Sequence, residues 1–438
     1  MRYNTTPLPK SEIELAVTLY PQEFERFQKK ALEEAVAEAE IDGFRKGKAA
    51  PELVKKKIGE SRLFERASVL GVEDTYPRIL KELAEKGPDF EPIGAPKVHL
   101  TKLNAGGGLE YKARLSILPL FQLPDYKKIA KVIFEKKEEV EISEKEIVNA
   151  LDWLRNSRAK EITVARPAQR GDRLEIDFEA AVGGVMLENG RSQNHPLIVG
   201  EGRFLPGFEE ALIGMKTDET KSFSLAAPDD YAETGLRGKT MDFSVTVRLV
   251  QERIIPEPTD DFASGVGKFA NIEELKKSIS EGIYADKEEK ERLRLRVKTA
   301  GALAEKTALE LPDLLIEREI AKMTAELKSG VEGMGMEWSA YLLNIKKDED
   351  GLKKEWQGEA ERRVKIALVL RQIAKIEKIE PSVEEIQEVT NHTVARLGID
   401  GAGFKKIDRD AFLEYNTTVA RNEKVFRFLE TFTENNYE

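Results

Sequence analysis

The chain has 438 residues, of which 40% are apolar and 34% are charged, and its formal net charge is −10. A chain of this length is expected to form about three domains of ~150 residues each. The acidic balance excludes a general nucleic-acid-binding protein, so any contact with RNA must be local. The sequence has no cysteine, which excludes disulfides and thiolate metal sites.

The remaining bulk features argue against a metal site or a membrane span. The three histidines, His99, His195 and His392, are far apart and have no metal-binding spacing. No segment approaches the roughly 18 consecutive apolar residues of a membrane-spanning helix, and the first residues lack the apolar core of a secretory signal. We therefore expect a cytoplasmic protein without metal, cofactor or membrane partner.

The first segment, up to about residue 117, has an α+β pattern. Alternation of apolar and polar residues predicts a half-buried strand, and apolar periodicity predicts helices. The strands are expected at 13–19, 98–103 and 109–117, and the helices at about 23–41, at 51–58 before Gly59, and from there to about 86. A glycine-rich loop, 104–108, joins the last two strands. No Lys-Ser/Thr pair follows it, so a plain turn is predicted rather than a phosphate-binding loop.

The loop between the first two helices combines glycines, cations and one aromatic residue. Its sequence, GFRKGK, comprises Gly43, Phe44, Arg45, Lys46, Gly47 and Lys48. Such a loop is expected to be exposed, because its backbone polar groups need water or a partner. Cations for phosphates and a ring for an apolar pocket are typical of a nucleoprotein contact. An ordinary helix–helix turn, with Phe44 folded inward, is the alternative that the loop alone leaves open.

The middle of the chain begins with a charged connector at 134–141. Ser143 and Glu146 then form a capping box that predicts a helix. From about 161 to 252 the pattern is strand-rich, with alternation at 174–180, 221–225 and 241–250 around one short helix at 206–212. This order predicts a twisted antiparallel sheet that wraps a helix.

Two weaker motifs in this segment do not indicate chemistry. Gly200 and Gly202 lack the third glycine and the βαβ unit of a dinucleotide-binding fingerprint. Ser192 and His195 have no third group to orient them, so they do not indicate a nucleophilic pair.

Everything after about residue 259 is predicted to be helical. The expected helices lie at about 271–309, from 312 onward, at 334–345, at 359–378, after Ser382, and at 410–432. No acid–base pair, metal cluster or phosphate loop is recognisable there. Amphipathic helices of this kind either bury their apolar stripes in a bundle or leave grooves open for client chains, and the pattern leaves both open.

Several strings resemble known families. GFRKGK after a long helix, and IGAP at 93–96, resemble the N-terminal domain of the bacterial trigger factor family; LPDLLIEREIAKMTAEL and PTDDFASGVGKFANIEELK resemble its C-terminal domain. GDRLEIDFEA, GEGRFLPGFEEALIGM and APDDYAETGLRGK, in that order, resemble the FKBP-type peptidyl-prolyl isomerase domain. The resemblance implies an α+β multidomain protein with an α+β ribosome-binding domain, an FKBP-like antiparallel sheet around a short helix, and an all-α chaperone domain. Its implied boundaries are 1–117, 118–160 for a linker and a helix that packs with the C-terminal domain, 161–254 and 255–438.

The resemblance also implies an isomerase pocket. Rotation about a peptide bond meets a barrier of ~18–20 kcal/mol, and an apolar pocket that binds the twisted amide better than the planar one lowers it without a nucleophile or a metal. Phe208 is expected to form the floor, and Tyr231 to donate a hydrogen bond to the substrate carbonyl. His195 and Leu187 stand where the family commonly has aromatic residues. The implied lining is Phe178, Leu187, Phe204, Leu205, Phe208, Tyr231 and Phe243.

The implied partners are the large ribosomal subunit and unfolded nascent chains. Phe44, Arg45 and Lys46 are expected to dock at the polypeptide exit tunnel, with local contact to ribosomal RNA, and a homodimer is expected off the ribosome. Because no nucleotide motif is present, we expect an ATP-independent, partly ribosome-bound chaperone with an accessory isomerase. Two alternatives remain: an isomerase whose helices tether substrates, and a ribosome-independent holdase.

Overall fold

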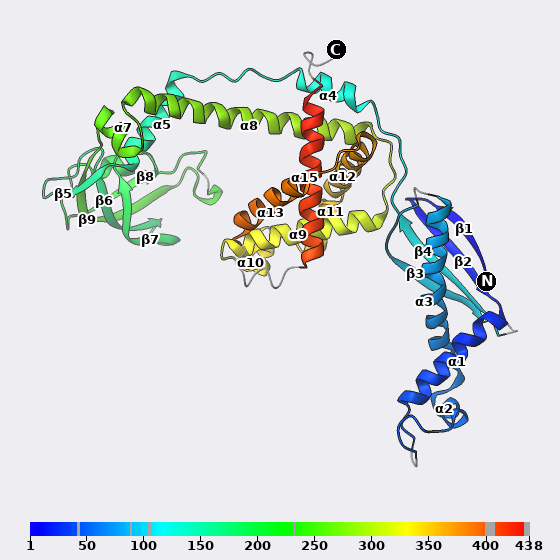
Figure 1. The fold of residues 1–438 in the computed structure, drawn as a ribbon. Coiled ribbons are helices and arrows are strands. Elements are labelled where there is room, and N and C mark those ends of the chain that lie inside the picture. The colour runs from blue at the N-terminus through cyan, green and yellow to red at the C-terminus, as the bar shows by residue number, and fades with distance from the viewer. Residues whose placement is uncertain (42–43, 88–89, 104–106, 232, 399–407, 433–438) are drawn as a thin grey trace. The chain divides into compact units, whose positions relative to one another are not determined.

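The computed structural model describes residues 1–41, 44–87, 90–103, 107–231, 233–398 and 408–432. The chain divides into two compact units. Its helices and strands are labelled in Figure 1. Unit 1 combines Met1–Lys137 with Arg292–Glu438, and unit 2 is Glu138–Glu291. In sequence, unit 2 is therefore an insertion into unit 1.

The N-terminal part of unit 1 contains a four-stranded antiparallel sheet of order β1-β2-β4-β3. Alternate residues of β2 are buried, as the sequence pattern predicts, while β1 was not predicted because its residues are mostly exposed and do not alternate. The strands are β1 Arg2–Leu8, β2 Glu12–Leu19, β3 Pro92–Leu103 and β4 Leu109–Ile117.

Three helices accompany this sheet: α1 Pro21–Glu38, α2 Pro51–Ile58 and α3 Glu60–Lys86. Helix α1 ends three residues before the predicted position, and Gly59 separates α2 from α3 with φ +88°. Gly71 lets α3 lie close to the sheet, since a Cβ there would stand 3.2 Å from a methyl carbon of Leu109. The side chains between α1, α3 and the sheet form the core of this part.

The remainder of unit 1 is helical. Helices α4, α12 and α15 share one core with the end of α8, through residues such as Ile133, Leu303, Ile373 and Leu429. Arg296 on α8 forms ion pairs with Glu423, at 2.8 Å, and with Glu430, both on α15. Helix α8, Ile272–Lys306, begins in unit 2 and enters unit 1 at Arg292. The other helices are α4 Tyr126–Phe134, α9 Asp313–Gly333, α10 Trp338–Asn344, α11 Glu349–Glu355, α12 Gln357–Glu377, α13 Val383–Leu397 and α15 Arg409–Glu430.

Unit 2 contains the second sheet, in which β9 pairs with β5, β6 and β8, and β6 pairs with β7. The sheet wraps α6, as the sequence pattern predicts, and its main core gathers around that helix. The elements are α5 Glu144–Ser157, β5 Lys160–Thr163, β6 Arg173–Val182, β7 Val185–Ile198, α6 Phe208–Leu212, β8 Thr220–Ala226, a 3₁₀ turn Thr234–Leu236, β9 Thr240–Ile254 and α7 Asp260–Val266.

Helix α5 begins at the capping box expected from the sequence. The Ser143 backbone N–H donates to the Glu146 carboxylate at 2.9 Å, and the Glu146 N–H donates to the Ser143 hydroxyl at 3.3 Å. Leu151 of α5 packs with Ala263 of α7 and Leu275 of α8. The segment before the barrel that packs in the helical core of unit 1 is α4, which was not predicted; with nine residues it is too short for a clear helical period.

Among the described helices, none has the length and apolar composition that crossing a membrane requires.

Candidate functional site

The centre of unit 2 is a cluster of aromatic rings contributed by separate elements. Phe178 lies on β6, Phe243 on β9 and Phe223 on β8. Phe208 is the first residue of α6, where Gly207 precedes it with φ +92°. Phe204 lies four residues earlier, in the loop after β7. The strand alternation and the short helix thus direct five rings to one place.

The ring contacts are close and well defined. Phe204 stacks on Phe208 with centroids 4.4 Å apart and an interplanar angle of 11°. Phe243 meets Phe208 edge-on at 5.1 Å, and Phe178 does so at 6.3 Å. Such pairs add about 0.5–1.5 kcal/mol each beyond the area that they bury. Phe208 is therefore the ring around which the others are arranged.

The structure brings all seven predicted pocket residues into this cluster. Leu205, Phe208 and Phe243 are buried, and the other four are partly buried against them: Phe178, Leu187, Phe204 and Tyr231. Whether these seven carry the isomerase activity stays a prediction. Sequence reasoning missed Phe223 as a member, although the alternation at 221–225 places it on the same strand face as Leu225.

His195 also belongs to the cluster. Its ring meets Phe178 at 5.5 Å and Phe204 at 5.4 Å, both edge to face. It is partly buried on β7. An imidazole therefore closes the side of the cluster where the family resemblance implied an aromatic ring.

A buried carboxylate lies directly beside the floor. Glu209 is 3% exposed, and its two oxygens accept hydrogen bonds from the backbone N–H groups of Gly200, Gly202, Arg203 and Phe204. Burial alone would raise the pKa of Glu209, but these N–H donors outweigh it and lower the pKa. Glu209 is therefore held as the anion that anchors the loop. Sequence reasoning did not identify this role.

Two other polar groups lie near the cluster, the Asp177 carboxylate and the Tyr231 hydroxyl. Asp177 accepts from the Asn194 N–H at 2.8 Å and from Arg248 at 2.7 Å, which lowers its pKa. Among the described residues, the Tyr231 hydroxyl has no hydrogen-bond partner. The arrangement offers an apolar surface and one hydroxyl donor, which suits binding of an apolar ring beside a carbonyl group rather than acid–base chemistry.

The basic loop of unit 1 is exposed where the structure describes it; Gly43 lies outside the described residues. The Phe44 side chain is 46% exposed, and Arg45, Lys46 and Lys48 are exposed as well. Buried Ala49 and a turn from Arg45 to Lys48, with Gly47 at φ +76°, fix the base of the loop. Phe44 therefore does not fold inward, and its role as a docking residue stays a prediction.

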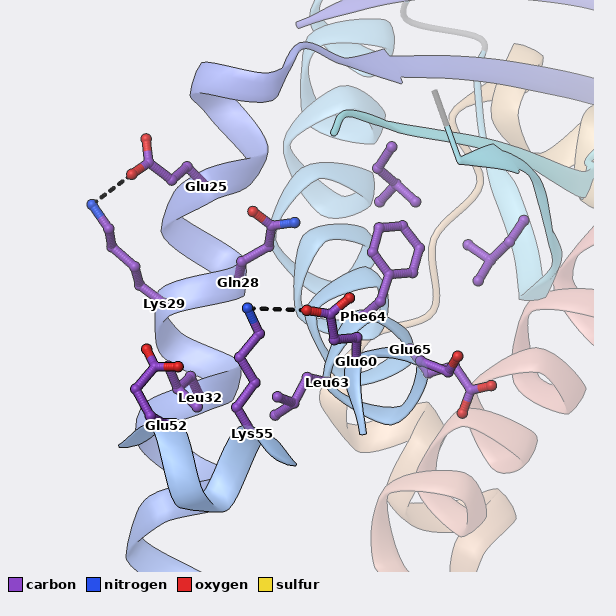
Figure 2. A pocket seen from close by; sticks show the side chains of 13 residues that line it. Glu25, Gln28, Lys29, Leu32, Glu52, Lys55, Glu60, Leu63, Phe64 and Glu65 are labelled. Carbon is purple, nitrogen blue, oxygen red and sulfur yellow. Dashed lines mark ion pairs between the residues drawn. The ribbon is translucent and has the colours of Figure 1, made fainter. Parts of the chain in front are cut away.

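A pocket of about 880 Å³ lies among α1, α2, α3 and the sheet (Figure 2). Leu32, Leu63 and Phe64 line it with apolar surface, and the charges at its rim pair with each other. Lys29 lies 2.8 Å from Glu25, and Lys55 lies 3.2 Å from Glu60. Sequence reasoning missed this concavity, because its lining comes from three helices that a local pattern does not bring together.

No group of His, Asp or Glu side chains within the described residues has the geometry of a metal site.

Comparison with known proteins assigns each part of the chain. Residues 1–154 match the family described as bacterial trigger factor protein, residues 271–430 match its C-terminus, and residues 164–248 match FKBP-type peptidyl-prolyl cis-trans isomerase. These matches confirm the predicted resemblance and the predicted isomerase domain.

Relatives and a solved structure agree with this assignment over the whole chain. The trigger factor of Caldicellulosiruptor saccharolyticus is 32% identical over 401 residues, which are 92% of this chain and 90% of the relative. The trigger factor of Clostridium kluyveri is 29% identical over 431 residues, 98% of each chain. A solved structure from a study of substrate recognition by the trigger factor chaperone has a TM-score of 0.56 and 20% identity, covers 98% of this chain and 99% of its own, and supports the multidomain fold. The chain therefore belongs to the bacterial trigger factor family, as a ribosome-associated chaperone with an FKBP-type peptidyl-prolyl isomerase domain.

Proposed function

We propose that the basic loop docks this chaperone at the polypeptide exit tunnel of the large ribosomal subunit. The exposed Phe44 ring would enter an apolar pocket, and Arg45 and Lys46 would contact ribosomal RNA phosphates. The support is that this local cluster of cations stands out on a chain of net charge −10. The protein would then be cytoplasmic and partly ribosome-bound, with a homodimer as its form off the ribosome.

The helical part of unit 1 is proposed to receive nascent chains. The observation that carries this proposal is the number of large apolar side chains exposed there, among them Met334 at 84%, Leu343 at 78% and Leu413 at 54%. A contiguous exposed apolar patch marks an interaction site in a folded protein, and we propose that these side chains form such a patch. It can cover apolar segments of a client without an energy source.

The aromatic cluster of unit 2 is proposed to twist X–Pro bonds. Phe208 would support the pyrrolidine ring, the six residues around it would exclude water, and the Tyr231 hydroxyl would donate to the substrate carbonyl. An apolar surround disfavours the planar amide relative to the less polar twisted amide, so the pocket binds the transition state better than the ground state.

Co-sedimentation with ribosomes tests the docking. The triple variant Phe44→Ala, Arg45→Ala, Lys46→Ala should lose most ribosome binding at physiological salt. A matched control removes two exposed cations and one exposed apolar side chain from α3, with Val69→Ala, Arg62→Ala and Lys81→Ala, and should bind normally. Intact binding by the loop variant would contradict the proposal.

Suppression of client aggregation separates the chaperone from an isomerase-centred function. Met334→Ser, Leu343→Ser and Leu413→Ser together should weaken protection of clients that need no proline isomerisation. Phe208→Ala should leave that protection intact and abolish acceleration of proline-limited refolding. If Phe208→Ala also abolishes protection, the helices serve mainly as a substrate tether.

A further inference from the structure

The face of Phe208 that a prolyl substrate needs is covered by another ring of the same chain. Phe208 is fully buried, and Phe204 lies nearly parallel to it at 4.4 Å. Rings at this separation are in van der Waals contact, so a pyrrolidine ring cannot enter between them. Phe204 therefore occupies the place that the proposed function assigns to the proline.

The other sides of Phe208 are closed by the core. Phe178, Phe223 and Phe243 meet it at interplanar angles of 80°, 65° and 79°. Phe204, Phe178 and Phe223 are all partly buried, but of these rings only Phe204 lies nearly parallel to Phe208 and covers a face of it. Moving this one ring would uncover that face, and among the other rings of the cluster only Phe178 and His195 would lose a contact with Phe204.

The loop that carries Phe204 is fixed by the residue that follows the floor in sequence. Four residues of that loop donate backbone N–H groups to the Glu209 carboxylate, at 2.7 Å from Gly200, 2.9 Å from Gly202, 2.8 Å from Arg203 and 3.4 Å from Phe204. Gly200 and Gly202 adopt φ +97° and +70°, which favour glycine. The Glu209 carboxylate, next to Phe208 in sequence, therefore holds the loop that carries Phe204 in place.

We propose that Phe204 is the gate of the proline pocket and that Glu209 is the positioning residue that holds this gate closed. The proposal rests on the proposed isomerase function. A prolyl segment must displace the Phe204 ring before it can contact Phe208. Binding energy from the rest of a long client, held elsewhere on the chaperone, can supply that displacement, whereas a short peptide has none to spare. The gate thus favours X–Pro bonds within extended, chaperone-bound chains over free short peptides.

The first test removes the gate in the full-length protein. If the gate is open about one-tenth of the time, Phe204→Ala should bind a short Xaa-Pro peptide about tenfold more tightly and raise kcat/KM by a similar factor. Peptide affinity is measured by fluorescence anisotropy, and kcat/KM by a proline-isomerisation assay on the same peptide. Unchanged or lower values would overturn the proposal.

A matched control removes a different neighbour of Phe208. Phe223 meets Phe208 edge-on at 5.5 Å, so it does not cover a face of that ring. Phe223→Leu should give no gain in affinity or kcat/KM, because it does not uncover the floor. A gain equal to that of Phe204→Ala would show that loosening the core suffices, and would overturn the specific role of Phe204.

The second test concerns Glu209. Glu209→Gln should raise kcat/KM for the short peptide in the otherwise unchanged protein and have no effect on it in the Phe204→Ala background, since its influence passes through the gate. A merely structural role would lower kcat/KM in both backgrounds and would overturn the assignment. Thermal unfolding confirms that each variant is folded at the assay temperature.

The outcomes separate the gate from the isomerase function. If the wild type and Phe204→Ala neither bind nor isomerise prolyl peptides, the proposed isomerase function is wrong, and the gate with it. If the wild type is active, Phe208→Ala is inactive and Phe204→Ala shows no gain, the function stands and the gate alone is wrong.

Discussion

Tyr111 buries its hydroxyl under α3 and hydrogen-bonds there to Thr75 at 2.8 Å. Because the Thr75 hydroxyl already donates to the Gly71 carbonyl at 2.6 Å, Tyr111 is the donor. Thr75→Val would leave the buried Tyr111 hydroxyl without an acceptor, so we expect a loss of about 1–3 kcal/mol in the free energy of unfolding. Adding Tyr111→Phe should recover part of that loss. Urea unfolding measures both, and a double variant less stable than Thr75→Val would contradict the assignment.

Arg296 is a second residue on which stability depends. Its guanidinium is nearly buried and pairs with two partly exposed carboxylates, Glu423 and Glu430. Arg296→Met removes the cation paired with Glu430, while Glu423 keeps its ion pair with Arg427 at 3.0 Å. We expect a loss of about 2 kcal/mol in the free energy of unfolding, below the ~3–5 kcal/mol of a fully buried pair. Chemical unfolding of the variant at pH 7 measures the change.

The ion pair between Arg296 and Glu423 predicts that the stability of the fold depends on pH. Burial alone would raise the pKa of Glu423, but the hydrogen bonds and charges of Arg296 and, after it, Arg427 lower it below its ordinary value of 4.5. Because the folded-state pKa is depressed, the contribution is present above the unfolded-state pKa and is lost as pH falls through the folded-state value. The stability difference between wild type and Glu423→Gln should therefore shrink below about pH 4. A difference that is constant from pH 7 to pH 3 would show that Arg296 and Arg427 do not stabilise the ionised form of Glu423.

At the residue scale, the sequence identified the members of the aromatic cluster except Phe223, but not their arrangement. Phe178, Phe208 and Phe243 lie on elements whose periodicity is clear, so their convergence follows from the fold. The stacking of Phe204 on Phe208 depends on a loop conformation held by Glu209, and no local pattern encodes four backbone donors that meet one carboxylate.

At the scale of elements, the capping box at the start of α5 affects the ionisation of Glu146. Lys287 lies 2.7 Å from Glu146, and with the amide and hydroxyl of Ser143 it lowers the pKa of Glu146 to about 2. The stability that the ionised Glu146 gives the folded protein is fully present above the ordinary pKa of glutamate and is lost as pH falls through the lowered pKa. An NMR titration should find Glu146 still ionised at about pH 3. Lys287→Met should move the midpoint of the Glu146 titration toward its ordinary value. Lys276 lies on α8 as Lys287 does, and Lys276→Met, which removes the ion pair with Glu273, should leave that midpoint unchanged.

The elements that sequence reasoning found carry a local signal. Helix α3 and strand β9 are long, and their buried positions repeat with a clear period, while the short helices α2 and α6 have proline or glycine at their ends. The missed strands β1 and β5 are mostly exposed edge strands, and the missed helices α4, α7 and α11 have nine residues or fewer. Their structure comes from pairing and packing with distant segments, which a local window does not contain.

At the scale of the whole molecule, the hydrophobic cores follow the two units. The clusters around Leu174 and around Leu151 lie within Glu138–Glu291, and those around Leu15, Leu303 and Ile316 lie in unit 1. No cluster in the described part of the chain draws residues from both. We therefore expect the core around Leu174 in unit 2 and the core around Leu303 in unit 1 to unfold in separate transitions, since they share no buried residue.

Two matched substitutions test this expectation. Leu174 and Leu303 are both fully buried, one in each unit, and truncation to alanine should cost each unit about 2–5 kcal/mol. In differential scanning calorimetry, Leu174→Ala should lower the Tm of one transition by roughly 5–15 °C, and Leu303→Ala should lower that of the other. If each substitution shifted both transitions equally, the two units would be one cooperative body despite their separate cores. Independent shifts would mean that the isomerase domain can be altered, as the Phe204 and Glu209 variants require, without changing the stability of the unit that carries the basic loop and the exposed apolar helices.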